Sequence, residues 1–315
     1  MRVATNAYTN AMLNQFNVLV SRQNNLQSQV STGLRIQTPA DDPTAMQNTL
    51  SYLANQSTQA QYSANIGTLQ TRATSVDSVL QSLQTISSRA GEIATSAGGA
   101  TTSQSDLTNY ADEINSLINQ VVNAANTKDP STGKYLFGGT ASGAAPFTTT
   151  TDASGNVTAV TYNGNSTVNQ AQIGAGMTAS ADVPGANTGS TGARGLITDS
   201  QSGADFLNHL ITLRNDLNAG NATAVTNTDS ANLQKDENNI AYQVANNGVL
   251  QNKLTAAAAF VTSNSQNLSQ MISNTSSADL MNTMVQLSQT QTSYQAALQS
   301  GSKIMSLSLL NYLPA

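Results

Sequence analysis

The protein contains no cysteine, no tryptophan and a single histidine, His209. Without cysteine it has no disulfides, thiolate metal ligands or thiol nucleophiles, and one histidine is too few for an HExxH metal site or a zinc finger. We interpret His209, in FLNHLITLRND, as a structural or solvated side chain on a helix face. Gly133-Lys134 lacks the neighbouring residues of a phosphate-binding P-loop. The sequence therefore predicts a protein that is not an enzyme, with no catalytic residue, no metal site and no cofactor.

Charged residues are also scarce, at 9% of the chain against about a quarter in a typical globular protein. The net charge is −5, and the 12 lysines and arginines are scattered singly, so we expect no nucleic-acid partner. No apolar run approaches the roughly 18–20 residues that span a membrane, so we expect no membrane insertion. The N-terminal MRVATNAYTNAMLNQF lacks the continuous apolar region of a secretory signal. On these grounds alone the protein would be assigned to the cytoplasm.

Apolar residues of the N-terminal part recur at alternating intervals of four and three, the seam of an amphipathic helix that pairs with another helix. The first seam predicts a helix over about residues 5–32. A second predicts a long helix over about 43–98, ended by Gly98-Gly99, and a third helix follows with Ser103 or Ser105 as its cap. The first seam consists of Met12, Phe16, Leu19, Gln23, Leu26 and Val30.

The C-terminal part repeats this pattern. A short helix is predicted around 206–217 and a long one through about 240–272, and a last helix begins after NTSSAD. Because the two halves are nearly symmetric, we expect them to pack antiparallel. The last seam consists of Leu280, Met284, Leu287, Gln291, Tyr294, Leu298, Gly301, Met305 and Tyr312.

The middle of the chain, residues 138–199, is rich in Gly, Ser, Thr and Asn and is predicted to be a small β-rich insertion. Within it the turn signals of ASGNVTAVTYNGNSTV predict short antiparallel strands. The predicted fold class is therefore mainly α: an antiparallel rod of long helices with paired terminal coiled-coil helices and a small β-rich insertion. We expect three domains. These are a terminal coiled-coil domain (1–42 and 278–315), a helical rod domain (43–137 and 200–277) and a β-rich variable domain (138–199).

The stretch STGLRIQTPADDP concentrates glycine, proline and charge between the first two predicted helices, and we interpret it as a hinge. Gly33 fits the left-handed position after a helix end, and Pro39 is expected to keep the linker extended. Asp42 suits the N-cap and Pro43 the first helical position. Asp41 and Asp42 are adjacent and have no other acidic residue nearby, so a metal or catalytic site is disfavoured. The hinge residues are Gly33, Pro39, Asp41, Asp42 and Pro43.

Three stretches resemble the flagellin superfamily. MRVATNAYTNAMLNQFNVLVSRQNNLQSQVSTGLRIQTPADDPTAM is similar to its N-terminus. YLFGGTASGAAPF (135–147) and the C-terminal QTQTSYQAALQSGSKIMSLSLLNYL narrow the resemblance to the hook–filament junction family. Major flagellins usually have alanine where this chain has Pro43, and generally lack YLFGG. The resemblance covers roughly 1–147 and 200–315, and leaves out 148–199, where the family varies most.

The resemblance implies a structural component of the bacterial flagellum that forms a one-layer ring between hook-associated protein 1 and flagellin. It implies self-association in the helical lattice and an extracellular location. It further implies export through the type III export apparatus without a cleaved signal, and a flagellar export chaperone bound around 280–310. The alternatives are a major flagellin filament subunit and, from a different class, a secreted coiled-coil effector. The second requires charged residues beside the seams, which are lacking.

The two terminal seams are narrow and cannot close a core alone, because apolar side chains stabilise a fold only when a partner covers them. We therefore expect the termini to be mobile in the monomer and to pair on assembly, whereas the helices of 43–127 and 205–275 form an ordinary intramolecular core. The residues predicted to pack between subunits are Met12, Phe16, Leu19, Leu26, Val30, Leu280, Met284, Leu287, Tyr294, Leu298 and Met305.

Overall fold

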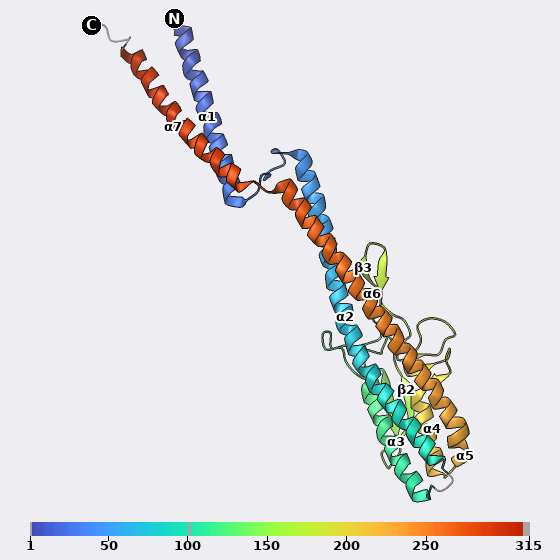
Figure 1. The fold of residues 1–315 in the computed structure, drawn as a ribbon. Helices are drawn as coiled ribbons and strands as arrows, with labels where there is room; N and C mark the ends of the chain where they lie inside the picture. The colour runs from blue at the N-terminus through green and yellow to red at the C-terminus, as the bar shows by residue number, and fades with distance from the viewer. Residues whose placement is uncertain (1, 100–101, 311–315) are drawn as a thin grey trace. The chain divides into compact units, whose positions relative to one another are not determined.

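The computed structural model describes residues 2–99 and 102–310, and the side chains of these residues except 2–6, 8, 9 and 304–310. Most of the described chain is helical and the strands are short (Figure 1), which confirms the predicted mainly α fold with a small β insertion. The helices are α1 (Arg2–Thr32), α2 (Pro43–Ala97), α3 (Gln104–Ala125), α4 (Phe206–Asn218), α5 (Ala222–Ala224), the π-helical turn η1 (Val225–Asp229), α6 (Ser230–Ser276) and α7 (Leu280–Leu310).

The start of α3 shows how local sequence sets a helix boundary. The Ser103 hydroxyl accepts a hydrogen bond from the backbone N–H of Asp106, and the Asp106 carboxylate accepts one from the N–H of Ser103. This reciprocal pair satisfies backbone donors that the helix cannot satisfy itself. Of the two caps left open by the sequence, Ser103 is the one used. The short α5 and η1, which precede α6, were not predicted.

The strands form three small separate sheets. The β1–β2 hairpin turns at Asp152, as the DASGN signal predicted, with the Asp152 carboxylate accepting from the N–H groups of Ser154 and Asn156 at 2.9 Å each. The strands are β1 (Phe147–Thr151), β2 (Val157–Tyr162), β3 (Ala171–Gly174), β4 (Met177–Ala179), β5 (Ala186–Asn187), β6 (Thr198–Asp199) and β7 (Ala204–Asp205).

One pair of strands, β5 and β6, runs parallel, and it lies outside the stretch for which antiparallel strands were predicted. The side-chain amide of Asn187 donates to the carbonyls of Thr191 and Ala193, at 3.0 and 2.8 Å. These two hydrogen bonds stabilise the loop after β5. The loop returns the chain to the first residue of β5, and β6 therefore runs beside β5 in the same direction. β6 then pairs with β7 in the antiparallel sense.

The described residues form two compact units. We call Met1–Thr58 with Asn264–Ala315 the terminal unit, and Gln59–Ser263 the inner unit. Both α2 and α6 contribute a segment to each. The three-domain division inferred from the sequence stays a prediction.

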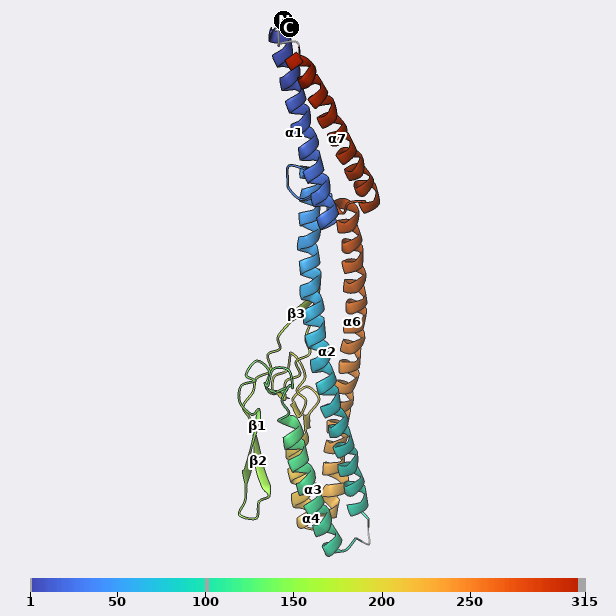
Figure 2. The ribbon, with the colours of Figure 1, turned by 90° about the vertical axis from the view of Figure 1, so that its left-hand side faces the viewer.

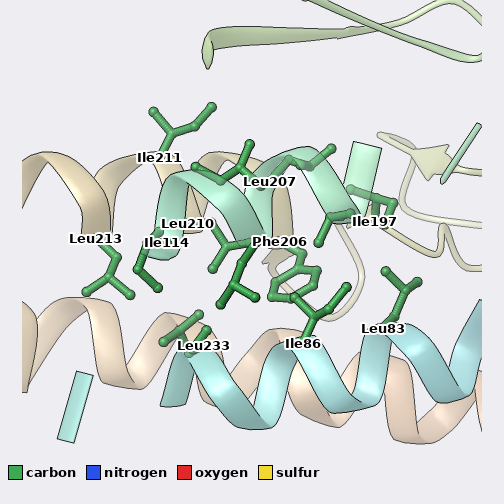
Figure 3. Close-up of a cluster of buried hydrophobic side chains, with 14 of the residues drawn as sticks. Leu83, Ile86, Ile114, Ile197, Phe206, Leu207, Leu210, Ile211, Leu213 and Leu233 are labelled. Atoms are coloured by element: carbon green, nitrogen blue, oxygen red, sulfur yellow. The ribbon is translucent and has the colours of Figure 1, made fainter. Parts of the chain in front are cut away.

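The core of the inner unit lies between α2, α3, α4 and α6 (Figure 3). Phe206 and Leu210 of α4 point towards Ile86 of α2 and Leu233 of α6, and all four are buried. Each such side chain contributes roughly 1.5–3 kcal/mol when fully buried, so the expected intramolecular core is confirmed for these helices. The YLFGG element joins it, since its Leu136 and Phe137 are completely buried in the same cluster.

The double glycine of YLFGG has a steric reason. Gly139 has a φ of +62°, and a Cβ there would overlap the backbone carbonyl oxygen of Asn165. A side chain at this position is therefore excluded both by backbone conformation and by space.

A second cluster lies between the adjoining segments of α2 and α6 within the inner unit, and the insertion completes it. Ile66 and Leu69 of α2 and Leu254 of α6 meet Ile173 of β3 and Ala179 of β4. Two helices cannot enclose a core alone, so the β3–β4 hairpin supplies the missing third side.

Side chains on the helices also bind the backbone of the insertion. Arg214 of α4 donates to the Val157 carbonyl at 2.7 Å, and Lys253 of α6 donates to the Thr178 carbonyl at 2.8 Å. Asn126, just after α3, donates to the Phe147 carbonyl and accepts from its N–H. These hydrogen bonds attach the insertion to the helices. The β1–β2 hairpin lies beside α3 and α4 (Figure 2).

Arg72 of α2 ties three segments together. Its guanidinium lies 3.4 Å from Asp129 Oδ2 and 2.9 Å from Asp182 Oδ1, and donates to the Leu136 carbonyl at 2.9 Å. The two carboxylate side chains are 4% and 9% exposed. A single arginine thus pairs with two nearly buried carboxylates, one beside YLFGG and one in the insertion.

Candidate subunit-packing surface and linker

Helices α1 and α7 pack against each other within one chain (Figure 2). The rings of Phe16 and Tyr294 meet edge to face, with centroids 5.8 Å apart. Gly301 is buried beside Met12, and a Cβ on Gly301 would overlap the Met12 methyl group. The pairing is antiparallel, because Phe16 follows Met12 along α1 whereas Tyr294 precedes Gly301 along α7.

The covered side of α7 carries small and polar residues as well as apolar ones. Two threonines are buried, and each hydroxyl donates to the carbonyl four residues earlier at 2.7 Å: Thr283 to Asp279 and Thr290 to Gln286. A threonine satisfied in this way can be buried without an unpaired hydroxyl. The covered residues, spaced alternately by four and three, are Thr283, Leu287, Thr290, Tyr294, Ala297 and Gly301.

The seam predicted for α7 shares only part of this set. Leu287, Tyr294 and Gly301 lie on the covered side, together with Met12, Phe16, Leu19, Leu26 and Val30 of the α1 seam, which are buried or half-buried. By contrast Leu280, Met284 and Leu298 are 43%, 53% and 47% exposed. The backbone of Met305 belongs to α7, but its side chain is outside the described part of the structure, and Tyr312 lies outside the described residues altogether.

Two further apolar residues of α7 were missed by the sequence reasoning. Met281 and Val285 are 80% and 51% exposed. The signal was present as the adjacent pairs Leu280-Met281 and Met284-Val285, which widen the apolar stripe beyond one seam. We define the outer face of α7 as Leu280, Met281, Met284, Val285 and Leu298.

The linker between α1 and α2 begins as the sequence predicted. Gly33 has a φ of +70°, and its N–H donates to the Gln29 carbonyl at 2.9 Å, which ends α1 in a left-handed cap. The Asp42 carboxylate accepts from the N–H of Ala45 at 3.0 Å, so Asp42 is the N-cap of α2 and Pro43 its first residue. The role of this stretch as a hinge stays a prediction.

Pro39 was expected to keep the linker extended, and this was wrong. The N–H of Asp41 donates to the Thr38 carbonyl at 3.1 Å, which closes a tight turn with Pro39 in its second position. Proline suits that position because its φ is preset. The Asp41 carboxylate accepts from the N–H groups of Thr38 and Gln37, and these two bonds lower the pKa of Asp41.

The linker is paired with the segment that joins α6 to α7. Leu34 forms an antiparallel bridge with Ser277, and the N–H of Ala278 donates to the Gly33 carbonyl at 2.9 Å. Arg35 donates through its backbone to Ser276 and through its guanidinium to the Thr275 carbonyl. The α1–α2 linker and the α6–α7 connection are thus hydrogen-bonded to each other. A change in the direction of one connection therefore requires a change in the other.

Chemistry-bearing groups gather mainly in the inner unit. His209 Nδ1 lies 2.7 Å from Asp236 Oδ2, and the other oxygen of Asp236 accepts from the N–H of Asp205 at 2.8 Å. This anchors α4 on α6, the structural role expected for His209. Within residues 2–99 and 102–310 no group of three or more acidic or histidine side chains is arranged to hold a metal ion, and no helix there has the length and apolar character of a membrane span.

Comparison with known proteins agrees with the resemblance seen in the sequence. Residues 3–142 match the family described as the bacterial flagellin N-terminal helical region. Flagellar hook-associated protein 3 of Salmonella typhimurium is 35% identical over 123 residues, which are 39% of this chain and 38% of that protein. The Escherichia coli protein of the same name is 35% identical over 120 residues. The match thus spans little more than a third of the length of these relatives, whose names are those of structural flagellar proteins and not of enzymes.

Solved structures show the same fold. A Vibrio parahaemolyticus protein described as a flagellar hook-associated protein has a TM-score of 0.63 at 21% identity, over 75% of this chain and all of that one. FlgL of Bacillus cereus has a TM-score of 0.55 at 18% identity, over 70% of this chain and 97% of its own. Over residues 3–142 the chain is therefore similar to the N-terminal helical region of the bacterial flagellins, and over 123 residues it is similar to flagellar hook-associated protein 3.

Proposed function

We propose that the protein is a structural component of the bacterial flagellum. In this proposal it forms an extracellular layer at the hook–filament junction, between hook-associated protein 1 and flagellin. Homology to hook-associated protein 3 carries the proposal. The family match at 3–142 supports it further, because that range holds α1, the linker, α2, α3 and YLFGG.

The outer face of α7 supplies the packing between copies. Its five apolar residues remain exposed although α1 already covers the other side of α7. Burial of each of these side chains by a neighbouring copy stabilises the contact by up to roughly 1.5–3 kcal/mol. The cost of desolvating charges is small, because α7 contains a single charged residue, Lys303. Contacts of this kind repeat head to tail around a helical lattice.

The same face suits an export chaperone before assembly. The chain travels unfolded through the type III export apparatus, without a cleaved signal, and cysteine-free composition avoids stray thiols on that route. An uncovered apolar helix stripe is the usual ligand of a hydrophobic groove. We place the chaperone on residues 280–310, so that chaperone and neighbouring copy compete for one surface.

The deciding experiment is deletion of the gene, followed by electron microscopy of the cell surface and an assay of flagellin in the medium. Hooks without filaments, with flagellin lost to the medium, are expected for a junction protein. Bare hooks with no flagellin anywhere would make this chain the filament subunit instead. Normal filaments would contradict both and leave the secreted coiled-coil protein. Restoring the gene on a plasmid controls for effects on neighbouring genes.

The packing surface is tested by complementing the deletion with Met284→Asp or Leu298→Asp. Both side chains are about half exposed, so the purified variants should unfold at the wild-type temperature, yet the cells should lack filaments. Gln289→Asp puts the same charge on an exposed polar position of α7 and should restore motility. Filaments built from both outer-face variants would refute packing through this surface while leaving the junction role intact.

A further inference from the structure

Two pairs of ionisable side chains face each other between α4 and the segment formed by η1 and α6. His209 and Asp216 lie seven residues apart on α4, and Asp229 and Asp236 lie seven residues apart on η1 and α6. The chain reverses between them. His209 lies beside Asp236, and because α4 also packs on η1, the same register places Asp216 opposite Asp229. Leu213 and Leu233, at intermediate positions, are buried in the core (Figure 3).

The two pairs differ in charge balance. The carboxylate of Asp236 is matched by His209 and by the N–H of Asp205. Asp229 is 1% exposed, and neither of its carboxylate oxygens has a hydrogen-bond partner among the described residues. The facing group, Asp216, is another carboxylate, whose Oδ1 accepts from the Asn221 amide at 3.3 Å. Two ionised carboxylates here lack a compensating cation, an arrangement that burial strongly disfavours.

We propose that Asp216 and Asp229 form a proton-dependent latch on the turn between α4 and α6. When the pair holds one proton, the Asp229 hydroxyl donates it to the Asp216 carboxylate and the turn is closed. When both groups are ionised they repel each other, and the turn loosens. No group other than the bulk solvent needs to supply or accept the proton.

The surroundings make Asp229 hold its proton to a higher pH than an exposed aspartate does. Burial, and then the charge of Asp216, raise the pKa of Asp229 from 3.8 to about 6, and His209 opposes them. Cationic side chains of the packed helices are engaged elsewhere. Arg214 of α4 binds the Val157 carbonyl and Asn115, and Arg89 of α2 pairs with Glu92 and with Glu113 of α3. Lys235 of α6 donates to the Asn232 side chain at 3.0 Å. Asp106 of α3 is occupied in its helix cap, and Asp112 is exposed.

The local backbone is suited to respond. Between α4 and α6 the chain forms only the three-residue α5 and the five-residue η1, and a π-helical turn is an irregular, strained element. The Ser230 hydroxyl donates to the Val225 carbonyl at 2.8 Å across η1. Short elements with few bonds open at low free energy, so repulsion at Asp229 should act on this turn before the surrounding core.

The sign follows from linkage. Folding raises the pKa of Asp229, so the folded protein holds the proton more tightly than the unfolded chain. The stabilisation is complete below about pH 4 and is lost as pH rises through about 6. The shift of about two pKa units corresponds to roughly a hundredfold in the opening equilibrium.

The test is hydrogen exchange of backbone amides at 219–233, measured at pH 5 and pH 8 and corrected for the intrinsic effect of pH. Protection in the wild type should fall by about tenfold between these values, because pH 5 lies only about one unit below the raised pKa of Asp229. Asp229→Asn should be equally protected at both. Asp216→Asn should shift the transition to lower pH, because it removes the repulsion and leaves the burial. Asp112→Asn, at an exposed position of α3, should behave like the wild type.

Histidine also changes charge between pH 5 and pH 8. The same hydrogen-exchange measurement is therefore made on His209→Gln. The proposal requires that His209→Gln keeps a pH-dependent turn and that Asp229→Asn loses it. The reverse pattern would assign the response to the His209–Asp236 pair and overturn the proposal. Equal wild-type protection at the two pH values would do the same.

Discussion

Arg72→Met gives the sharpest test of how the insertion is held on the helices. Methionine keeps much of the aliphatic stem but removes the charge that faces Asp129 and Asp182. Because these carboxylates are only 4% and 9% exposed, the variant leaves two uncompensated anions in a nearly dry site. Breaking a buried ion pair by removing one partner costs about 3–5 kcal/mol, and we expect a loss of that size in the free energy of unfolding.

The measurement is urea unfolding followed by circular dichroism, with Arg89→Met as the matched control. Arg89 also pairs with two carboxylates, Glu92 and Glu113, but its side chain is 46% exposed. Surface ion pairs contribute about 0–1 kcal/mol, so the control should lose little. Equal losses in the two variants would refute the reasoning, because burial would then not decide the contribution of the pair.

Three further predictions concern single positions. Gly139→Ala should lower the free energy of unfolding by roughly 2–4 kcal/mol through its left-handed backbone and the clash with Asn165, whereas Gly143→Ala, where a Cβ meets open space, should change it little in the same urea titration. Asp42→Ala should destabilise the start of α2 by about 1 kcal/mol, since it removes the N-cap bond to Ala45; amide exchange at Thr44–Gln47 measures this, and unchanged protection would contradict it. Gly301→Leu should separate α7 from α1 at Met12, which would appear as faster exchange in α1 with no change in the inner unit.

The helices were predictable because their signal is long and periodic. Apolar residues that recur at alternating intervals of four and three over many turns are typical of an amphipathic helix and of no other regular structure. Capping residues mark where these helices begin, as Asp42 does for α2 and Ser103 for α3. The π-helical turn η1 has no comparable signal, since VTNTD lacks both periodicity and a cap. Its geometry follows from the buried Val225 and Asp229 and from the short return between α4 and α6.

The way the insertion is fastened could not be read from the sequence. Arg72 stands in TRATSV among other polar residues of a long amphipathic helix, and its partners lie 57 and 110 positions further along the chain. Nothing local distinguishes it from the exposed Arg89. The same holds for β5 and β6, whose parallel pairing depends on the side-chain amide of Asn187 and not on a turn motif.

The packing surface shows the limit of periodicity most clearly. On an α-helix, residues three and four apart share a face, so a stripe wider than one seam fits two ladders shifted by one position. In α7 the sequence pattern favours the ladder through Leu280, Met284 and Leu298, because these three residues are apolar. In the structure α1 instead covers the ladder through Thr283 and Thr290. The within-chain contact takes the side with the smaller residues, where Gly301 lets Met12 approach closely. The larger apolar residues are left outside, where only a second molecule can cover them, so the mismatch between the predicted and the observed seam is itself the reason to look for an intermolecular contact on α7.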